Sequence, residues 1–234
     1  MSEISNNGIV SSVVERSRGL VLILLVILLS TISISCNSEN ASDCFQDTGE
    51  IIREEVDVQE FTKITVFENV TLVIKQGPAQ KVEIETGKNL RNEVNAVVED
   101  GRLLLTDTND CNYVRDYGTT IVYVTTSNLT EIRSSTGYPI RSDGILNYES
   151  LSLLSESFAV PEAVTTDGEF NLNLNVSSLG ITVNGIAYFN LRGNVKTFNI
   201  NIAAGDSRIE AEELVAQNVN INHRGSNDVL INPQ

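Results

Sequence analysis

Tryptophan is absent from the 234-residue sequence, and histidine occurs only once, as His223. A metal site built from several histidines is therefore excluded, and a catalytic triad that depends on histidine is disfavoured. Basic residues are also scarce, with 16 Lys and Arg against 31 Asp and Glu, which gives a formal net charge of −15. Because phosphate binding needs clustered Lys and Arg, this balance argues against a nucleic acid partner.

The composition is nevertheless that of a folded protein, since 41% of the residues are hydrophobic and 20% are charged. The length allows one or two domains. The sequence contains no GxxxxGK[ST], GxSxG or HExxH motif, so no phosphate-binding loop, hydrolase nucleophile or zinc protease helix is indicated. We therefore predict a protein that is not an enzyme and that needs no cofactor.

The first 35 residues have the features of an exported protein's signal peptide. Arg16 and Arg18 precede the aliphatic run Leu20–Leu29, and small residues follow up to Cys36. Ten aliphatic residues are too few for a bilayer, which needs roughly 20. With Ser30–Ser35 added the run approaches that length, so an uncleaved anchor or an ordinary secretory signal stays open as an alternative.

The sequence Ser33-Ile34-Ser35-Cys36 resembles the lipobox of bacterial lipoproteins, although Ser33 stands where that family usually has Leu, Val or Ile. The resemblance implies removal of residues 1–35 and lipidation of Cys36 with acyl chains such as palmitate. Two or more chains on one residue anchor a protein stably. Residues 36–51 would then be a polar tether, and Asn37 after the cysteine favours the outer membrane, on either its periplasmic or its surface face.

Two further cysteines, Cys44 and Cys111, remain if Cys36 carries lipid. An even pair in an oxidising compartment predicts a disulfide. Two free thiols are the alternative, and a thiol enzyme is disfavoured because neither cysteine belongs to a CxxC motif.

Residues 52–127 alternate apolar and polar side chains in short runs, which predicts strands. Asp100-Gly101 separates two of these runs and is the dipeptide expected at a tight hairpin. We therefore expect an antiparallel, hairpin-rich N-terminal part. Only Glu210–Gln217 has a helix-forming composition, and that stretch is short.

Residues 128–234 repeat a pattern of strand, small-residue corner and strand. The repeated strand segments begin 22, 21, 26 and 21 residues apart. A period of this length predicts stacked coils, so we expect an all-β domain over 52–234 that continues into a right-handed parallel β-helix-like solenoid. An ordinary β-sandwich is the alternative. The segments are Leu129–Arg133, Leu151–Leu154, Leu172–Val176, Phe198–Ile202 and Val219–Asn222, and the corners include Ser134–Gly137, Ser155–Ser157, Ser177–Gly180, Ala203–Gly205 and Gly225-Ser226.

Asparagines alternate with apolar residues in the last repeats, as in Asn171–Asn175, Asn199–Asn201 and Asn218–Asn222. Period-two geometry places them on the face opposite the core. In stacked coils they could form hydrogen-bonded ladders on a solvated face, or they could form a polar carbohydrate-binding face.

Three segments in order, Phe61–Gly77, Val98–Leu105 and Val122–Ile132, resemble the family described as putative auto-transporter adhesin, head GIN domain. The likeness extends over about residues 54–232. It implies an exported all-β protein with no established enzymatic role. The corners depart from the family's Ser-Gly-Ser pattern, so no function beyond turning the chain is assigned to them.

From these features we predict a non-enzymatic, lipid-anchored cell-envelope protein with an adhesin-like or other binding or structural role. The alternative is a carbohydrate-active or carbohydrate-binding β-helix protein. The partners expected are a membrane, through the lipid, and a glycan or a cell-surface protein. Unpaired strand edges at a solenoid end would also allow weak self-association through the last coil.

The candidate chemical groups are few. Acidic residues cluster locally, and Asp206 and Glu210 are weak candidates for calcium or for an acid–base pair. An enzyme should bring carboxylates from at least two neighbouring coils into one concave site. Three tyrosines could stack on sugars, although core or hairpin packing is the commoner use. The candidate residues are Asp206, Glu210, Glu212, Glu213, His223, Tyr113, Tyr117 and Tyr123.

Overall fold

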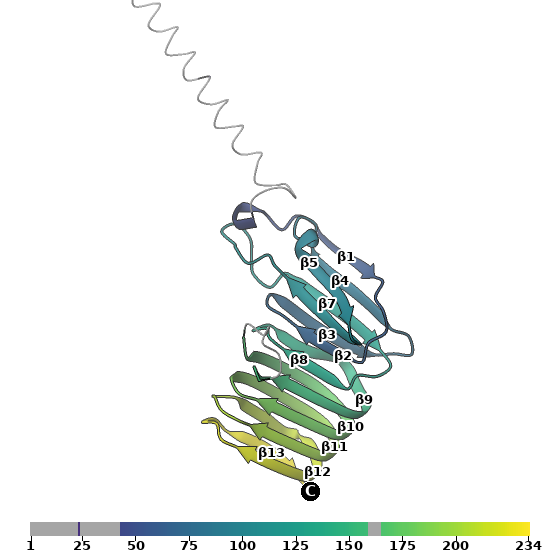
Figure 1. Ribbon diagram of the computed structural model, residues 1–234, viewed down its shortest axis with the longest axis vertical. Helices are drawn as coiled ribbons and strands as arrows, with labels where there is room; N and C mark the ends of the chain where they lie inside the picture. The colour runs from purple at the N-terminus through teal and green to yellow at the C-terminus, as the bar shows by residue number, and fades with distance from the viewer. Residues whose placement is uncertain (1–22, 24–42, 159–164) are drawn as a thin grey trace, which may run out of the picture.

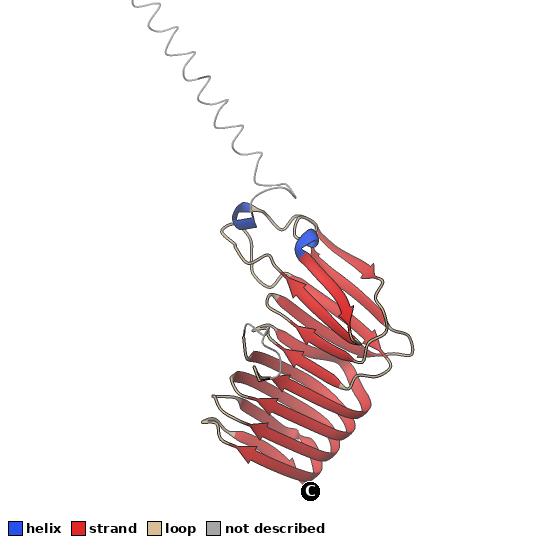
Figure 2. Ribbon diagram, viewed as in Figure 1, coloured by secondary structure: helices blue, strands red, loops and turns tan. Residues whose placement is uncertain are grey.

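The computed structural model describes residues 23, 43–158 and 165–234 (Figures 1 and 2). It is an all-β structure in which 13 strands form one mixed sheet. The helical elements described after residue 42 are two short 3-10 turns, η1 (Asp43–Phe45) and η2 (Arg91–Glu93). Within the described residues, no helix is long and apolar enough to cross a membrane. The predicted signal peptide, Cys36 and residues 37–42 of the tether lie outside the described residues.

The strands fall into two groups along the chain. The N-terminal region, residues 43–127, contains seven short strands, and the C-terminal stack, residues 128–234, contains six. The strands are β1 (Ile51–Val56), β2 (Lys63–Val66), β3 (Val70–Gln76), β4 (Lys81–Gly87), β5 (Val94–Glu99), β6 (Arg102–Asp107), β7 (Thr120–Thr126), β8 (Glu131–Ser134), β9 (Pro139–Ser155), β10 (Asp167–Val183), β11 (Ile186–Ile202), β12 (Arg208–His223) and β13 (Val229–Pro233).

The N-terminal region mixes antiparallel and parallel pairs. β1 with β4, β4 with β7, and β5 with β6 are antiparallel. The β5–β6 hairpin turns at Asp100 and Gly101, which have φ of 48° and 72°, as the sequence predicted. The expectation of antiparallel pairing throughout this region is wrong, because β2 and β3 pair in parallel with β6, β7, β8 and β9. Alternation along one strand shows which residues are buried, but it does not reveal the direction of the neighbouring strand.

In the C-terminal stack, β9 to β13 pair in parallel, each beside the next along the chain. The pairing of β10 with β11 runs from Asp167 opposite Ile186 to Val183 opposite Ile202. This step advances 19 residues (186 − 167 and 202 − 183), whereas the steps from β9 to β10 and from β11 to β12 are longer and change at a register shift. Figure 1 shows these strands following one another down the long axis of the molecule.

The long strands bend where the alternation of buried residues changes phase. In β10 the buried positions are Phe170 to Val176 at even numbers and Leu179 to Val183 at odd numbers. The phase therefore changes at Ser177-Ser178, where the sequence predicted a corner. β10 continues through this corner without a break. The sequence predicted two short strands here, and the structure has one bent strand.

Glu210–Gln217, which has a helix-forming composition, is also strand and lies within β12. Its residues pair with β11 over Asn190–Val195, so tertiary stacking overrides the local helix preference.

A single apolar core extends through both regions and includes Ile64, Leu72, Leu153 and Ile200. At its centre the rings of Phe170 and Phe189 stack with centroids 4.7 Å apart. Both rings are fully buried, and their residues are register partners on adjacent strands. The sheet therefore wraps around one continuous core, and its outward side chains form the surfaces available for function.

Candidate binding surface

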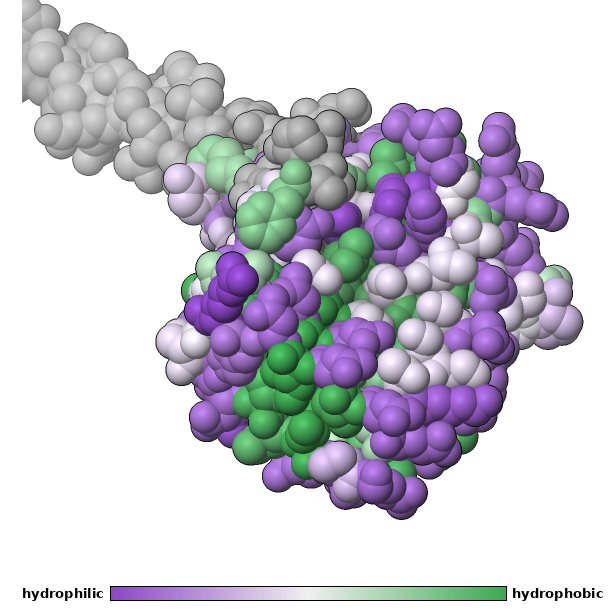
Figure 3. Space-filling view, turned by 60° about the horizontal axis from the view of Figure 1, so that its bottom comes forward, coloured by the Kyte–Doolittle hydropathy of each residue, from purple (hydrophilic) through white to green (hydrophobic). Residues whose placement is uncertain are grey.

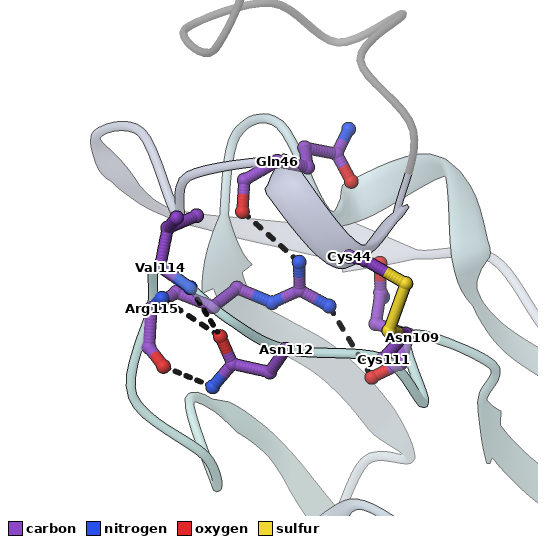
Figure 4. The surroundings of a disulfide bond; sticks show 7 residues. All are labelled: Cys44, Gln46, Asn109, Cys111, Asn112, Val114 and Arg115. Atoms are coloured by element: carbon purple, nitrogen blue, oxygen red, sulfur yellow. Dashed lines mark hydrogen bonds between the residues drawn. A yellow bond between two sulfur atoms is a disulfide. The ribbon is translucent and has the colours of Figure 1, made fainter.

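The end of the molecule nearest the predicted anchor is cross-linked. Cys44 and Cys111 form a disulfide with a Cα–Cα distance of 4.5 Å (Figure 4). The backbone N–H of Tyr113 also donates to the carbonyl of Cys44 at 3.0 Å. The Arg115 guanidinium donates to the carbonyl of Gln46 at 3.0 Å. The loop after Cys111 is therefore tied to the first residues of the fold by covalent and polar contacts.

The three tyrosines suggested by the sequence have different surroundings. Tyr113 and Tyr117 are exposed, and the Tyr113 ring lies 5.6 Å from that of Phe45. Tyr123 is covered, because the Arg53 guanidinium lies 3.7 Å from its ring centroid. Tyr113 and Tyr117 are thus accessible at the anchor end, while Tyr123 has a cation–π partner.

A groove of about 450 Å³ follows the line along which successive strands of the stack begin. We call it the turn groove. Because β10, β11 and β12 are in register there, Glu169, Tyr188 and Arg208 form one row across three neighbouring strands. The groove is lined by Gly137, Asp167, Gly168, Glu169, Ile186, Ala187, Tyr188, Asp206, Arg208 and Asn227.

Tyr188 and Arg208 both bind Glu210 at the edge of the turn groove. The Tyr188 hydroxyl donates to one carboxylate oxygen, and Arg208 Nε donates to the other at 2.8 Å. The hydrogen bond from Tyr188, followed by that from Arg208, lowers the pKa of Glu210. Glu210 therefore stays ionised at neutral pH and is poorly suited to donate a proton as a general acid.

These contacts also orient the tyrosine ring. Glu210 lies two residues beyond Arg208, the register partner of Tyr188. To reach Glu210, the Tyr188 side chain must extend along the sheet surface instead of standing upright from it. Tyr188 lines the turn groove together with the exposed side chain of Ile186.

The acidic cluster suggested by the sequence is divided in the structure. Asp206 lines the turn groove and accepts a hydrogen bond from Ser226 Oγ at 2.8 Å. Glu212 and Glu213 are exposed at an irregularity in β12, where the register with β11 shifts. In the part of the chain that the structure describes, no group of three His, Cys, Asp or Glu side chains is placed to hold a metal ion.

Carboxylates from different strands do share the turn groove. Asp167 and Glu169 come from β10, whereas Asp206 precedes β12, so β11 lies between them. Two strand spacings of about 4.8 Å separate β10 from β12. Sequence proximity could not show this grouping, because Asp167 and Asp206 are distant along the chain.

A second groove of about 390 Å³ lies on the side where the strands bend. We call it the amide groove. The Tyr148 hydroxyl is buried in its wall, and burial raises the pKa of Tyr148 to about 12. Its lining is rich in amides and contains one lysine. The lining residues are Tyr148, Asn175, Val176, Ser177, Asn194, Val195, Lys196, Val215, Gln217 and Gln234.

The alternating asparagines form ladders, as predicted. Asn220 donates to Asn199 at 2.9 Å and Asn222 donates to Asn201 at 2.8 Å. Asn175 donates to Asn147 at 2.7 Å. These side chains connect neighbouring strands, so they stabilise the stack and are only partly available to a ligand.

The single histidine closes a turn. Gly225 N–H donates to His223 Nδ1 at 3.0 Å, and His223 Nε2 lies 2.7 Å from the carbonyl oxygen of Asn227. Both ring nitrogens therefore have local partners, and the geometry gives His223 a structural role between β12 and β13.

Sequence reasoning missed a buried ion pair between Arg133 and Glu156. Arg133 Nη1 lies 2.7 Å from Glu156 Oε1, and the side chains are only 4% and 5% exposed. The pair joins β8 to the corner after β9. The sequence does show that Glu156 is unusual, because it is a charged residue between the small corner residues Ser155 and Ser157. Nothing in the sequence identifies Arg133 as its partner.

A family model described as putative auto-transporter adhesin, head GIN domain, matches residues 60–234. A solved structure of a putative adhesin from Bacteroides fragilis is 18% identical, with a TM-score of 0.64 over 78% of this chain and 81% of that one. A putative adhesin from Parabacteroides merdae is 16% identical, with a TM-score of 0.53 over 77% and 82% of the two chains. At 18% and 16% identity, the similarity to these two structures shows that the chains share a fold. No curated protein matches the sequence.

Proposed function

The chain belongs to the putative auto-transporter adhesin, head GIN domain family, and we propose from this membership that it is a non-enzymatic, lipid-anchored binding protein of the cell envelope. Under this proposal Cys36 carries the lipid in the outer membrane, and the folded part presents its outward side chains to a ligand. The observation that carries the binding role is the turn groove, which gathers an aromatic ring, an exposed isoleucine and carboxylates from β10 and from the turn before β12.

The architecture supports presentation of a surface away from the membrane. We propose that the C-terminal stack is a short right-handed parallel β-helix, supported by the parallel pairing of successive strands and by the register of β10 with β11, which keeps one step along its whole length. Such stacking repeats a groove along the axis, because each coil adds an equivalent position. Asp43, the first residue described after Cys36, lies seven positions beyond it, so the N-terminal end of the fold would face the membrane.

The anchor is tested by replacing Cys36 with Ala. We expect the variant to leave the membrane fraction, because acylation at this residue would be the attachment. A Ser33→Leu variant, which restores the usual lipobox residue, is the matched control and should stay membrane-bound. Continued tight association of the Cys36→Ala chain would contradict lipid anchoring and favour an uncleaved hydrophobic anchor.

The binding role is tested with labelled full-length protein in detergent, applied to arrays of glycans and of envelope proteins. Tyr188→Ala should abolish captured signal, because it removes the ring that lines the turn groove. Tyr113→Ala, which alters an exposed tyrosine at the opposite end, should leave the signal unchanged. Equal signal from the wild type and from Tyr188→Ala would exclude the turn groove as the binding site.

A second candidate is carbohydrate processing, favoured by the acidic side chains that β10 and the turn before β12 bring into one groove. Paired carboxylates at such separations serve as acid and base in glycoside hydrolysis. Incubation of the purified chain with neutral polysaccharides and measurement of reducing ends decides this. Sugar release that disappears in Asp206→Asn would replace the binding proposal with an enzymatic one.

A further inference from the structure

In the described part of the chain, no strand pairs with the outer side of the last part of the C-terminal stack. Residues 218–223 of β12 pair with β11 on one edge, and β13 pairs with the first half of β12. Among the strands that the structure describes, none pairs with the other edge of either segment. We call residues 217–234 the terminal coil.

Loss of a neighbour exposes residues that belong to the core. Ile221 is 46% exposed, whereas its register partner Ile200 is 2% exposed. Val219, Val229 and Ile231 are half-buried against the core. Figure 3, in which this end of the molecule comes forward, shows a continuous apolar patch surrounded by polar side chains. A contiguous patch of this kind marks an interaction surface.

The two edges of the sheet are protected differently. At one edge, β1 has the sequence Ile-Ile-Arg-Glu-Glu-Val, so charged side chains discourage pairing with another strand. At the other edge, Pro233 in β13 removes a backbone donor. Residues 217–222 of β12 contain neither proline nor a charged side chain, and they alternate asparagine with β-branched residues. The N–H and C=O groups of β12 are thus the ones open to a further strand.

Charge indicates which partner fits this edge. The terminal coil contains one Arg, Arg224, and one Asp, Asp228, so its formal charge is zero with His223 neutral. The remaining residues therefore carry the whole −15. Two copies approaching by any acidic face would repel each other, whereas two terminal coils meet without net repulsion.

We propose that two copies of this chain associate through their terminal coils, with residues 218–222 of one copy paired antiparallel to the same residues of the other. A two-fold axis across the strand produces antiparallel pairing, in which each backbone donor meets the equivalent acceptor. In this register Val219 of each copy lies opposite Ile221 of the other, on the core face of the sheet, and the apolar core continues across the junction.

This arrangement has a consequence that rests on the proposed lipid anchor. The terminal coil lies at the end of the molecule opposite the N-terminal region (Figure 1). Association by terminal coils therefore places the two anchors at opposite ends of the pair. Two lipidated copies would then join two separate membranes, which is homophilic adhesion.

Sedimentation equilibrium of the full-length chain in density-matched detergent tests the pairing. We expect a dimer that strengthens as salt screens the acidic surfaces. Ile221→Lys should raise the dimer dissociation constant by roughly 30-fold or more, because a charge would be buried at the junction. The matched control is Ile145→Lys, at an exposed isoleucine of β9, which should leave the constant unchanged.

Hydrogen exchange gives a second measurement that does not depend on a substitution. Amide exchange of residues 218–222 should slow as protein concentration rises, while that of β1 stays constant. A monomer at all concentrations, or a dimer that is indifferent to Ile221→Lys, would overturn the pairing.

Vesicles carrying the lipidated chain test the membrane arrangement separately. Two populations should cluster only when both carry the protein, and Ile221→Lys should prevent this. A detergent dimer without clustering would refute the bridging of membranes and leave the pairing intact. Failure of Cys36→Ala to release the protein would refute the anchor alone.

Discussion

The N-terminal region and the C-terminal stack obtain stability by different means. In the N-terminal region the short strands run in both directions, a disulfide closes the loop from Cys44 to Cys111, and ion pairs join β1 to β4. In the stack, long parallel strands repeat the same contacts, and rows of identical or similar side chains do the joining. The difference teaches that a non-repeating region depends on individual cross-links, whereas a repeating one depends on contact between neighbours.

The largest expected effect comes from disrupting the stack at its centre. Phe189→Ala should lower the free energy of unfolding by about 3–5 kcal/mol, because it removes a buried ring stacked on Phe170. Urea denaturation followed by circular dichroism measures this. Phe158→Ala is the control, since Phe158 is 69% exposed and should cost little. Similar losses in both variants would mean that packing between neighbouring strands is not what holds the stack.

Removal of the disulfide should act on the other region. The double variant Cys44→Ser and Cys111→Ser should lose about 2–4 kcal/mol, since a cross-link over 67 residues restricts the unfolded chain. Hydrogen exchange should show lost protection in β1 and β4, with β10 and β11 unchanged. Equal loss in all four strands would show that the two regions unfold as one cooperative unit.

A ladder asparagine should have a smaller effect. Asn220→Ala removes a hydrogen bond to Asn199 at an exposed position, so we expect a loss of about 0.5–1 kcal/mol. Asn232→Ala, at an exposed position in β13, is the matched control. Thermal unfolding of the two variants separates the ladder bond from the general effect of losing an amide.

The smallest effect concerns an ion pair and depends on pH. The hydrogen bond from Arg53, followed by that from Lys81, lowers the pKa of Glu83 from its ordinary 4.5. Because the folded-state pKa is depressed, the stabilisation is present above the unfolded-state pKa and is lost as pH falls through the folded-state value. Arg53 is well exposed, so the contribution is at most about 1 kcal/mol.

Glu83→Gln tests this contribution. The variant should be slightly less stable than the wild type at neutral pH and should approach it as the pH is lowered through the folded-state pKa of Glu83, because Glu83 itself then becomes protonated. Urea titrations across this range measure the difference. A constant difference at every pH would mean that Glu83 acts by packing and not by charge.

Much of the fold could be predicted from local patterns. The hairpin at Asp100-Gly101, the corner at Ser177-Ser178 and the asparagine ladders all follow from residue type and spacing. The direction of β2 and β3 could not be predicted, because they pair with strands far along the chain and alternation is the same for either direction. Local composition also failed to predict the structure of Glu210–Gln217. Its residues favour a helix, but pairing with β11 makes the segment a strand.

The candidate site was less accessible to sequence reasoning. The sequence indicates Asp206, but its neighbours in the turn groove, Asp167 and Tyr188, come from β10 and β11. Such groupings depend on the number of residues between paired strands, which differs from pair to pair and is known only from the register. The buried pair of Arg133 and Glu156 was missed for the same reason.

The position of the disulfide has a mechanical consequence. If Cys36 is held by a membrane and the far end by a partner, tension enters the fold at Cys44. The bond to Cys111 lets this force bypass residues 45–110, which include β1 to β6. A pulled molecule could therefore lengthen only by unravelling the chain beyond Cys111, and the part next to the membrane would keep its shape under load.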